Sequence, residues 1–223
     1  KSVTLPAITY TNKSGTSVTQ AEQSFSDVKW LLGGFDVYLH CGDTETTAHH
    51  VLLIPSSTLQ RNVCMNPTAD TTGAYIGSDM WTVHMPNWAT AVQNAFGSAH
   101  VLSHKEYLTN AINATADAGS GHNCVGTATA CAWATVLVNI PCESMVYGGS
   151  PWSSSGEDTR DFPRILPLYA LKCGHLDDRS WFWLRNVASA SNFAAASTNG
   201  YATCTAASRA TAAGGIRLYF LLR

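Results

Sequence analysis

Two strongly apolar segments near the C-terminus enclose a tract of small, almost entirely uncharged residues, and this arrangement most constrains how the chain can fold. The first segment, Trp181-Phe182-Trp183-Leu184, predicts a strand whose large side chains alternate between two faces and fill core. The second, Ile216 to Leu222, has the period of two typical of a strand with one buried face. Residues 186–215 between them hold eleven alanines and a single charge, Arg209.

This small-residue tract is predicted to be ordered. It has no helical apolar stripe, and the pairs Asn199-Gly200 and Gly214-Gly215 interrupt it. A structureless loop of about 30 residues inside a compact domain would be unusual. We therefore expect short strands and loops in the tract, pinned by Phe193 and Tyr201.

Composition limits the classes of function. The 223 residues are 45% hydrophobic and suffice for one sizeable core. Only 13% are charged and the net charge is −2, so no basic field favours nucleic-acid binding. No apolar run approaches the roughly 20 residues that span a bilayer, so membrane insertion is not expected. Residues 1–26 are polar and predict an N-terminal arm or linker, which leaves 27–223 as one domain.

The remaining pattern predicts a mixed α+β domain with an antiparallel sheet, two helices and extensive loops. We expect strands near 35–39, 50–54 and 135–140, and an irregular or edge strand at 164–171. One helix is expected at 87–96, where Trp88, Val92 and Phe96 share a face. A second helix is expected from Ser103, with Glu106 at the capping-box position.

Candidate catalytic and metal-binding groups are scattered. Seven cysteines of irregular spacing favour buried thiols, although Cys124 could bridge to Cys131 or Cys142. The same cysteines with His122 leave a zinc site or a Cys/His hydrolase open, but match no compact metal motif. The acid pairs Glu157-Asp158 and Asp177-Asp178 are expected in solvated turns or beside Arg160 and Arg179. No nucleophile elbow, phosphate loop or dinucleotide fingerprint occurs, so neither an enzyme nor a cofactor is expected.

Several segments carry a resemblance to a known family. The C-terminal half has WFWLR, NVASASNFA, NGYA and GGIR followed by LYFLL; upstream stand HVLLIPSSTL, MNPTADTTGAYIGSDMW, FGSAHVLSHKEYLTNAI and ESMVYGGSPW. Together they resemble the variable proteins of diversity-generating retroelements, especially phage and prophage members. The resemblance covers most of 28–223 and leaves out the N-terminal arm.

The resemblance implies a C-type lectin fold whose C-terminal strand pairs near the start of the domain. It also implies a variable region, about 186–215, diversified at adenines of AAC-type codons. Such codons cannot encode Lys, Glu, Gln, Met or Trp after mutation, and residues 192–216 contain none of these. The Glu-Pro-Asn and Trp-Asn-Asp calcium motifs of sugar-binding C-type lectins are absent, so no metal is implied.

By register with the family, the diversified, ligand-binding positions fall between residues 195 and 211. They are Ala195, Ser197, Thr198, Tyr201, Thr203, Cys204, Thr205, Ala206, Arg209 and Thr211. The implied fixed scaffold comprises Phe193, Ala194, Gly200, Ala202, Ala207, Ser208 and Arg217.

The expected function is thus a diversified ligand- or receptor-binding display protein on a phage tail tip, within the virion, or on a bacterial cell surface. The expected partner is a protein or glycan receptor on a host or other cell. A homo-oligomer, with a trimer as one candidate, is left open. The alternatives are a structural virion component and the Cys/His hydrolase.

Overall fold

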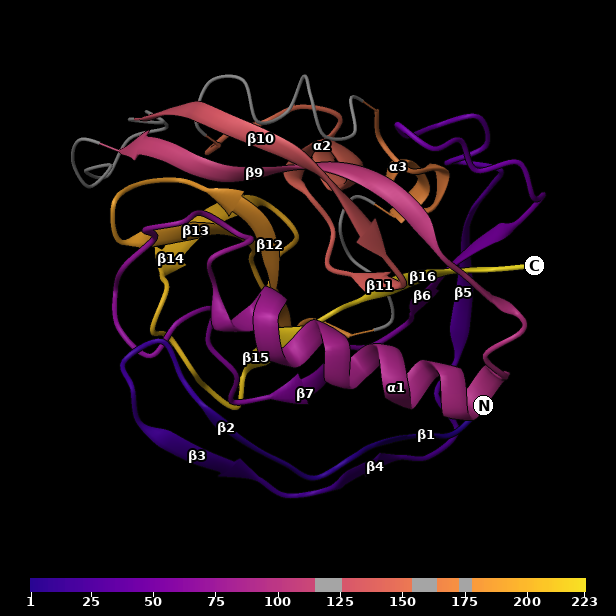
Figure 1. Ribbon diagram of the computed structural model, residues 1–223, viewed down its shortest axis with the longest axis horizontal. Helices are drawn as coiled ribbons and strands as arrows, with labels where there is room; N and C mark the ends of the chain where they lie inside the picture. Colours follow the sequence, from indigo (N-terminus) through magenta and orange to yellow (C-terminus); the bar gives the residue numbers. More distant parts are fainter. Residues whose placement is uncertain (115–125, 154–163, 173–177) are drawn as a thin grey trace.

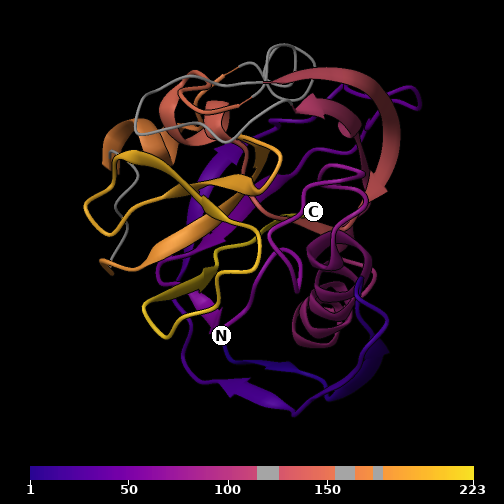
Figure 2. The ribbon, with the colours of Figure 1, turned by 90° about the vertical axis from the view of Figure 1, so that its left-hand side faces the viewer.

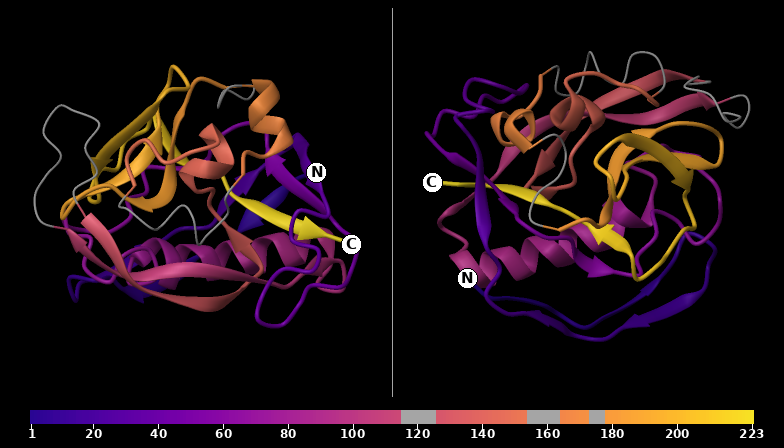
Figure 3. Two further views of the ribbon diagram at one scale, coloured as in Figure 1. Left: turned by 90° about the horizontal axis from the view of Figure 1, so that it is seen from above. Right: turned by 180° about the vertical axis from the view of Figure 1, so that it is seen from behind.

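The C-terminal strand β16 (Tyr219–Leu222) is at the centre of one of two five-stranded sheets (Figure 3). The computed structural model describes residues 1–114, 126–153, 164–172 and 178–223. In the first sheet the order is β11 (Val138–Asn139), β16, β6 (Val51–Pro55) and β5 (Trp30–Phe35), and β8 (Val101–Leu102) also pairs with β16. All of these pairs are antiparallel.

The second sheet is built mainly from the C-terminal tract. Its order is β14 (Ala202–Ala206), β13 (Asn192–Ala196), β12 (Trp181–Val187), β15 (Gly214–Ile216) and β7 (Leu59–Arg61). Only the β12–β15 pair is parallel. Figure 2 shows the gold strands of this sheet on one side of the molecule and the α1 helix on the other.

The alternation predicted for the aromatic block is confirmed. Trp181 and Trp183 pack in one hydrophobic cluster, and Phe182 and Leu184 pack in a second. The closing segment differs from expectation, because both of its faces are buried. Phe220 joins the first cluster and Tyr219 the second, so the strand separates two cores.

Helix α1 (Met85–Phe96) confirms the first predicted helix and continues from a π-helical segment, η1 (Met80–His84). Trp88 and Val92 are fully buried, as the apolar stripe predicts. Phe96 packs edge-on against Trp30 of β5, with 5.5 Å between the ring centroids. The helix is thereby fixed to the first sheet.

The second predicted helix is wrong. Residues after Ser103 form β9 (His104–Ala114), which pairs antiparallel with β10 (Gly126–Val136) in a long hairpin (Figure 1). The buried side chains His104, Glu106 and Leu108 alternate with the less buried Lys105 and Tyr107. This two-residue period and the partner strand outweigh the capping-box spacing.

Three other predicted strands also differ. Most of residues 164–171 belong to helix α3 (Pro167–Lys172), because Pro167 suits the first turn of a helix, where its missing N–H costs nothing. Helix α2 (Glu143–Tyr147) precedes it in the chain. Strand β5 ends at Phe35, since Asp36 has a left-handed φ of 52°. The strand expected at 135–140 is divided between the end of β10 and β11.

The expected N-terminal arm packs against the rest of the domain. It contains β1 (Val3–Leu5), β2 (Ile8–Thr11), β3 (Ser17–Gln20) and β4 (Gln23–Phe25), which run below α1 in Figure 1. β1 pairs with β4, and β2 with β3. Val3 and Leu5 are buried in the same cluster as Trp88. Two alternating apolar residues, together with polar contacts such as the Lys13–Asp70 ion pair, hold this polar segment against the rest of the chain.

The fold is mixed α+β, rich in strands and poor in helices. None of the helices in the described parts of the chain is long and apolar enough to cross a membrane.

Candidate ligand-binding surface

The predicted variable region is built on a wall of buried aromatic residues. All seven residues of β12 are buried. Its partner β13 places Ala196 opposite Phe182 and Ala195 opposite Trp183, and both alanines are buried. Small side chains are needed there because the rings of β12 occupy the space on both faces. β14 then covers β13 and is the edge strand of the sheet.

Nine of the ten predicted ligand-binding positions are accessible to solvent. Thr198, Tyr201 and Arg209 are exposed, and six others are half-buried. The six are Ser197, Thr203, Cys204, Thr205, Ala206 and Thr211. They lie on β14, on the turn before it and on the loop that follows it.

Ala195 contradicts the predicted set. Its exposed fraction is 1%, and it belongs to the core cluster that contains Trp183 and Phe193. The residue pairs with Thr203 in register, so its side chain points into the sheet's packed face. A ligand at the surface cannot reach it.

The strand geometry divides the predicted positions on β14 between two faces. Thr203 and Thr205 pair with Ala195 and Phe193, so they share the face of the Trp183 cluster. Cys204 and Ala206 pair with Ala194 and Asn192 and lie on the opposite face. The predicted variable positions thus form a rim around an edge strand, and not one flat plane.

On the first face, three predicted positions gather around Trp181. The Arg209 guanidinium lies 5.1 Å from the centre of the Trp181 ring, and its Nη1 donates to Thr205 Oγ1 at 3.2 Å. Trp181 Nε1 donates to Thr211 Oγ1, also at 3.2 Å. A cation held over an indole in this way is pre-oriented, which lowers the entropy lost on binding.

At the other end of β14, a tight turn carries Tyr201. The Ser197 amide donates to the Tyr201 carbonyl at 3.0 Å, and Gly200 supplies a φ of 84° that other residues rarely adopt. Phe193 is fully buried, as expected of an anchor, but Tyr201 is 61% exposed. Tyr201 therefore does not pin the strands and is presented to solvent.

The other candidate chemistry is not assembled in the described chain. His122 and Cys124 lie outside the described residues, while Cys142 is buried and Cys131 half-buried. Within the four described ranges, no group of three or more His, Cys, Asp or Glu side chains could hold a metal ion.

The acid pairs are only partly described. Glu157, Asp158 and Asp177 lie outside the described residues. Asp178 does not pair with Arg179 as one alternative expected: it forms ion pairs with the buried Arg217 and, at 3.4 Å, with Arg61. Asp178 therefore joins the end of β7 to the segment between β15 and β16.

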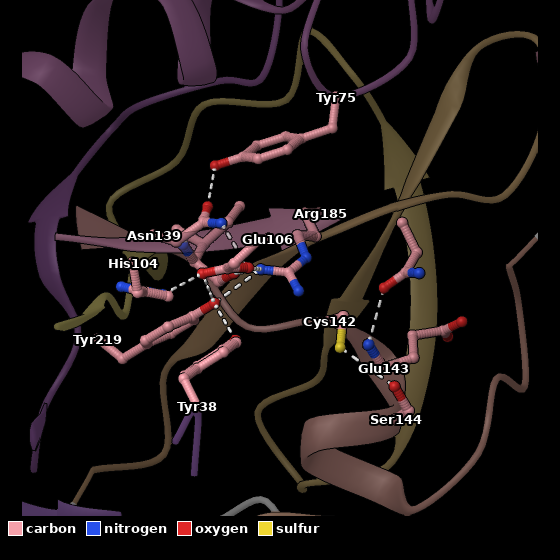
Figure 4. A network of polar contacts seen from close by, with 12 residues as sticks. Tyr38, Tyr75, His104, Glu106, Asn139, Cys142, Glu143, Ser144, Arg185 and Tyr219 are labelled. Atoms are coloured by element: carbon pink, nitrogen blue, oxygen red, sulfur yellow. Dashed lines mark hydrogen bonds and ion pairs between the residues drawn. The ribbon is translucent and has the colours of Figure 1, made fainter. Parts of the chain in front are cut away.

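A buried polar network centred on Glu106 is the feature that the sequence pattern missed (Figure 4). Glu106 accepts hydrogen bonds from His104 Nε2 at 2.7 Å, Arg185 Nη1 at 2.6 Å and Tyr219 OH at 2.7 Å. Asn139 Nδ2 donates to the same carboxylate at 3.2 Å. These residues come from β9, β11, β12 and β16, so the network joins the hairpin to both sheets.

The electrostatics indicate a structural role for this network. Burial alone would raise the pKa of Glu106, but the Arg185 charge and the His104 hydrogen bond outweigh it and lower the pKa from 4.5 to about 2. Glu106 is therefore ionised, and its side chain is 1% exposed. A carboxylate with four donors and almost no contact with solvent is suited to holding strands together. The sequence signal for it was Arg185, a charged residue in the largely apolar strand β12.

Positions expected to be fixed and positions expected to vary differ in solvent accessibility. Of the residues expected to be fixed, Phe193, Ala194, Gly200, Ala207 and Arg217 are buried, while Ala202 and Ser208 are half-buried. Of the residues expected to vary, only Ala195 is buried.

No family model, no curated protein and no solved structure matches this chain.

Proposed function

We propose that the protein is a diversified display protein that binds a receptor through residues 197–211, on a C-type lectin-like domain. The observation that carries the proposal is the separation of accessibility: nine of ten expected variable positions reach solvent, and five of seven expected scaffold positions are buried. A diversified surface requires this separation, because variation in the core would unfold the protein.

The buried residues below the rim make the accessible positions tolerant to substitution. Substitutions at accessible positions away from special contacts usually change stability by about 0.5 kcal/mol or less. Phe193, Trp183 and Ala194 stay fixed below the rim and keep β13 and β14 in place. Many different side chains can then be carried by one backbone.

The strand order of the first sheet also agrees with the C-type lectin-like proposal. β16, at the C-terminal end of the sequence, pairs with β6, which pairs with β5 near the expected start of the domain. A C-terminal strand paired with a strand in the first part of the domain supports the proposal.

The rim of this particular sequence has few large contact residues. Tyr201 and Arg209 are the two residues on it of the types that dominate binding energy in protein interfaces. Each copy therefore binds weakly, and several copies on one tail tip or cell surface raise the overall affinity through avidity. The partner is a protein or glycan receptor on a cell surface.

Sequencing the encoding locus across a population tests the diversification itself. We expect replacements concentrated at 197–211 and restricted to the codon set described above, with Phe193, Ala194 and Ala207 constant. A locus without such variation would support the structural virion component in place of the display protein.

A binding experiment tests the surface. The double variant Tyr201→Ala, Arg209→Ala should reduce adsorption to host cells, measured against the parent protein presented at the same copy number. The matched control is Phe35→Ala, because Phe35 is also an exposed aromatic residue, at 69%, but lies on the other sheet. Equal losses in both variants, or no loss in the double variant, would refute the surface assignment.

A further inference from the structure

A cleft of about 290 Å³ lies between the N-terminal strands and the end of β7. Figure 1 shows β2 and β3 passing below β7. The residues around it include Tyr10, Gln20, Gln23, Gln60, Arg61, Asn62 and His84. β7 and β14 are opposite edges of the same sheet, but the cleft adjoins the loop that follows β14, because the Asn62 amide donates to the Thr211 carbonyl at 3.2 Å.

The floor of the cleft is a fixed array of polar side chains. Trp88 Nε1 donates to Gln60 Oε1 at 2.6 Å. Gln60 Nε2 donates to Gln20 Oε1 at 2.9 Å and lies 3.5 Å from His84 Nδ1. Gln60 and His84 are 3% and 4% exposed. The Gln60 amide therefore has partners for both its oxygen and its nitrogen, and it orients its neighbours.

The backbone at this floor adopts an uncommon conformation. Gln60 and Asn62 have φ values of 23° and 58°, in the region that favours glycine. Backbone strain of this kind persists only where the surrounding structure imposes it, and it concentrates at binding sites. Here it is associated with four amide side chains around one opening: Gln20, Gln23, Gln60 and Asn62.

Hydrogen-bonding capacity remains open around this floor. Gln20 Nε2 is buried and has no hydrogen-bond partner. Within the described residues, the side-chain amides of Gln23 and Asn62 also make no hydrogen bond. A buried amide donor that is left unpaired costs free energy, so a ligand that accepts from Gln20 gains that amount on binding.

The charge of the cleft favours an uncharged ligand. Burial lowers the pKa of His84 to about 4, so its ring is neutral near neutral pH. Arg61 is the one charged side chain among the lining residues, and Asp178 lies 3.4 Å from it. Neither an anion nor a cation would meet an unopposed charge of opposite sign.

We propose that this cleft binds a neutral polyol, which Gln20, Gln23 and Asn62 recognise through adjacent hydroxyl groups. A side-chain amide offers a donor and an acceptor side by side, and two neighbouring hydroxyls offer the complementary pair. The Tyr10 ring, which lies edge-on to His84 with 5.8 Å between centroids, supplies an apolar wall for the carbon atoms of the ligand. The proposal is independent of the receptor-binding function.

The test is an NMR titration of the full chain with three probes: methyl α-D-glucopyranoside, glycerol and gluconate. We expect the neutral probes to shift the side-chain amide signals of Gln20, Gln23 and Asn62 at millimolar concentrations, and gluconate to bind at least about tenfold more weakly. Binding of the glucoside alone identifies a saccharide ring as the ligand, while binding of both neutral probes identifies any short polyol.

Two variants and a matched control make the test specific. Gln20→Glu keeps the acceptor for Gln60 but removes the open donor, and Asn62→Gly keeps the left-handed backbone but removes the amide. Each should weaken binding about tenfold. Gln93→Glu makes the same chemical change in a different groove, beside α1, and should leave binding unchanged.

Three results would overturn the proposal. They are the absence of saturable shifts with either neutral probe, tighter binding of gluconate than of the glucoside, and undiminished binding in both variants. Because Asn62 is exposed, Asn62→Gly remains informative even where Gln20→Glu fails to fold.

Discussion

Replacing Ala195 by tyrosine tests whether the buried residues below the rim of predicted variable positions are as closely packed as the structure indicates. The residue is 1% exposed and lies between Trp183 on β12 and Thr203 on β14. Protein interiors have the packing density of organic crystals, so no space exists for a phenol ring. The ring must displace Trp183 or separate the strands.

The expected magnitude follows from this geometry. Overpacking by a few carbon atoms costs about 1–3 kcal/mol, and a whole ring belongs at or above the upper end. A loss of about 3 kcal/mol in a domain of this size lowers Tm by roughly 6–12 °C. Thr203→Tyr is the matched control, because the same ring enters at the neighbouring, half-buried position in register.

Thermal unfolding followed by circular dichroism separates the two variants. Thr203→Tyr should change stability by no more than about 0.5 kcal/mol, or roughly 2 °C in Tm, since tyrosine suits strands. If Ala195→Tyr melted within roughly 2 °C of the parent protein, Ala195 would be a tolerant surface position and the packing argument would fail.

Three further predictions concern the scaffold. Because the pKa of Glu106 falls from 4.5 to about 2, its ionised form contributes about 3 kcal/mol above about pH 5, and this is lost as the pH falls through 2. Denaturant titrations should therefore show Glu106→Gln less stable than the parent at neutral pH and closer to it in acid; a constant difference would contradict this. Gly214→Ala should lower Tm by at least roughly 6 °C, because the new Cβ would lie 2.2 Å from the Trp181 carbonyl oxygen; an unchanged Tm would show that β15 can move away. Partial burial raises the pKa of Cys64, so iodoacetamide should label it at least about tenfold more slowly in the native protein than in urea, as measured by peptide mapping, and equal rates would show that the thiol is freely accessible.

The sequence pattern correctly predicted the elements in which the local spacing of apolar residues matches the burial of their side chains. The alternation of Trp181 to Leu184 and the stripe of α1 are local periodicities, and both are confirmed. The small-residue tract was correctly expected to form strands, since two apolar strands enclose it.

Other elements depended on partners far away in the sequence. The segment after Ser103 has a helix-start spacing, yet β10 makes it a strand. Glu106 and Arg185 are 79 residues apart, and nothing local in a single sequence pairs them. The N-terminal strands are polar, and their contacts with α1 and with Gln60 come from residues far away in the sequence.

The small, uncharged residues of the C-terminal tract have two separate explanations: packing at the buried positions and the proposed codon restriction at the accessible ones. Ala194, Ala195 and Ala196 are small because the rings of β12 leave no room, and Gly214 because any Cβ would meet Trp181. These residues carry no information about codon diversification, although they contribute to the absence of Lys, Glu, Gln, Met and Trp. The codon argument therefore rests on the accessible positions of 197–211, where nothing in the packing excludes a lysine or a glutamate. Replacing one such position, Thr203, by lysine should leave the fold intact, and that tolerance is what makes the absence of lysine there informative.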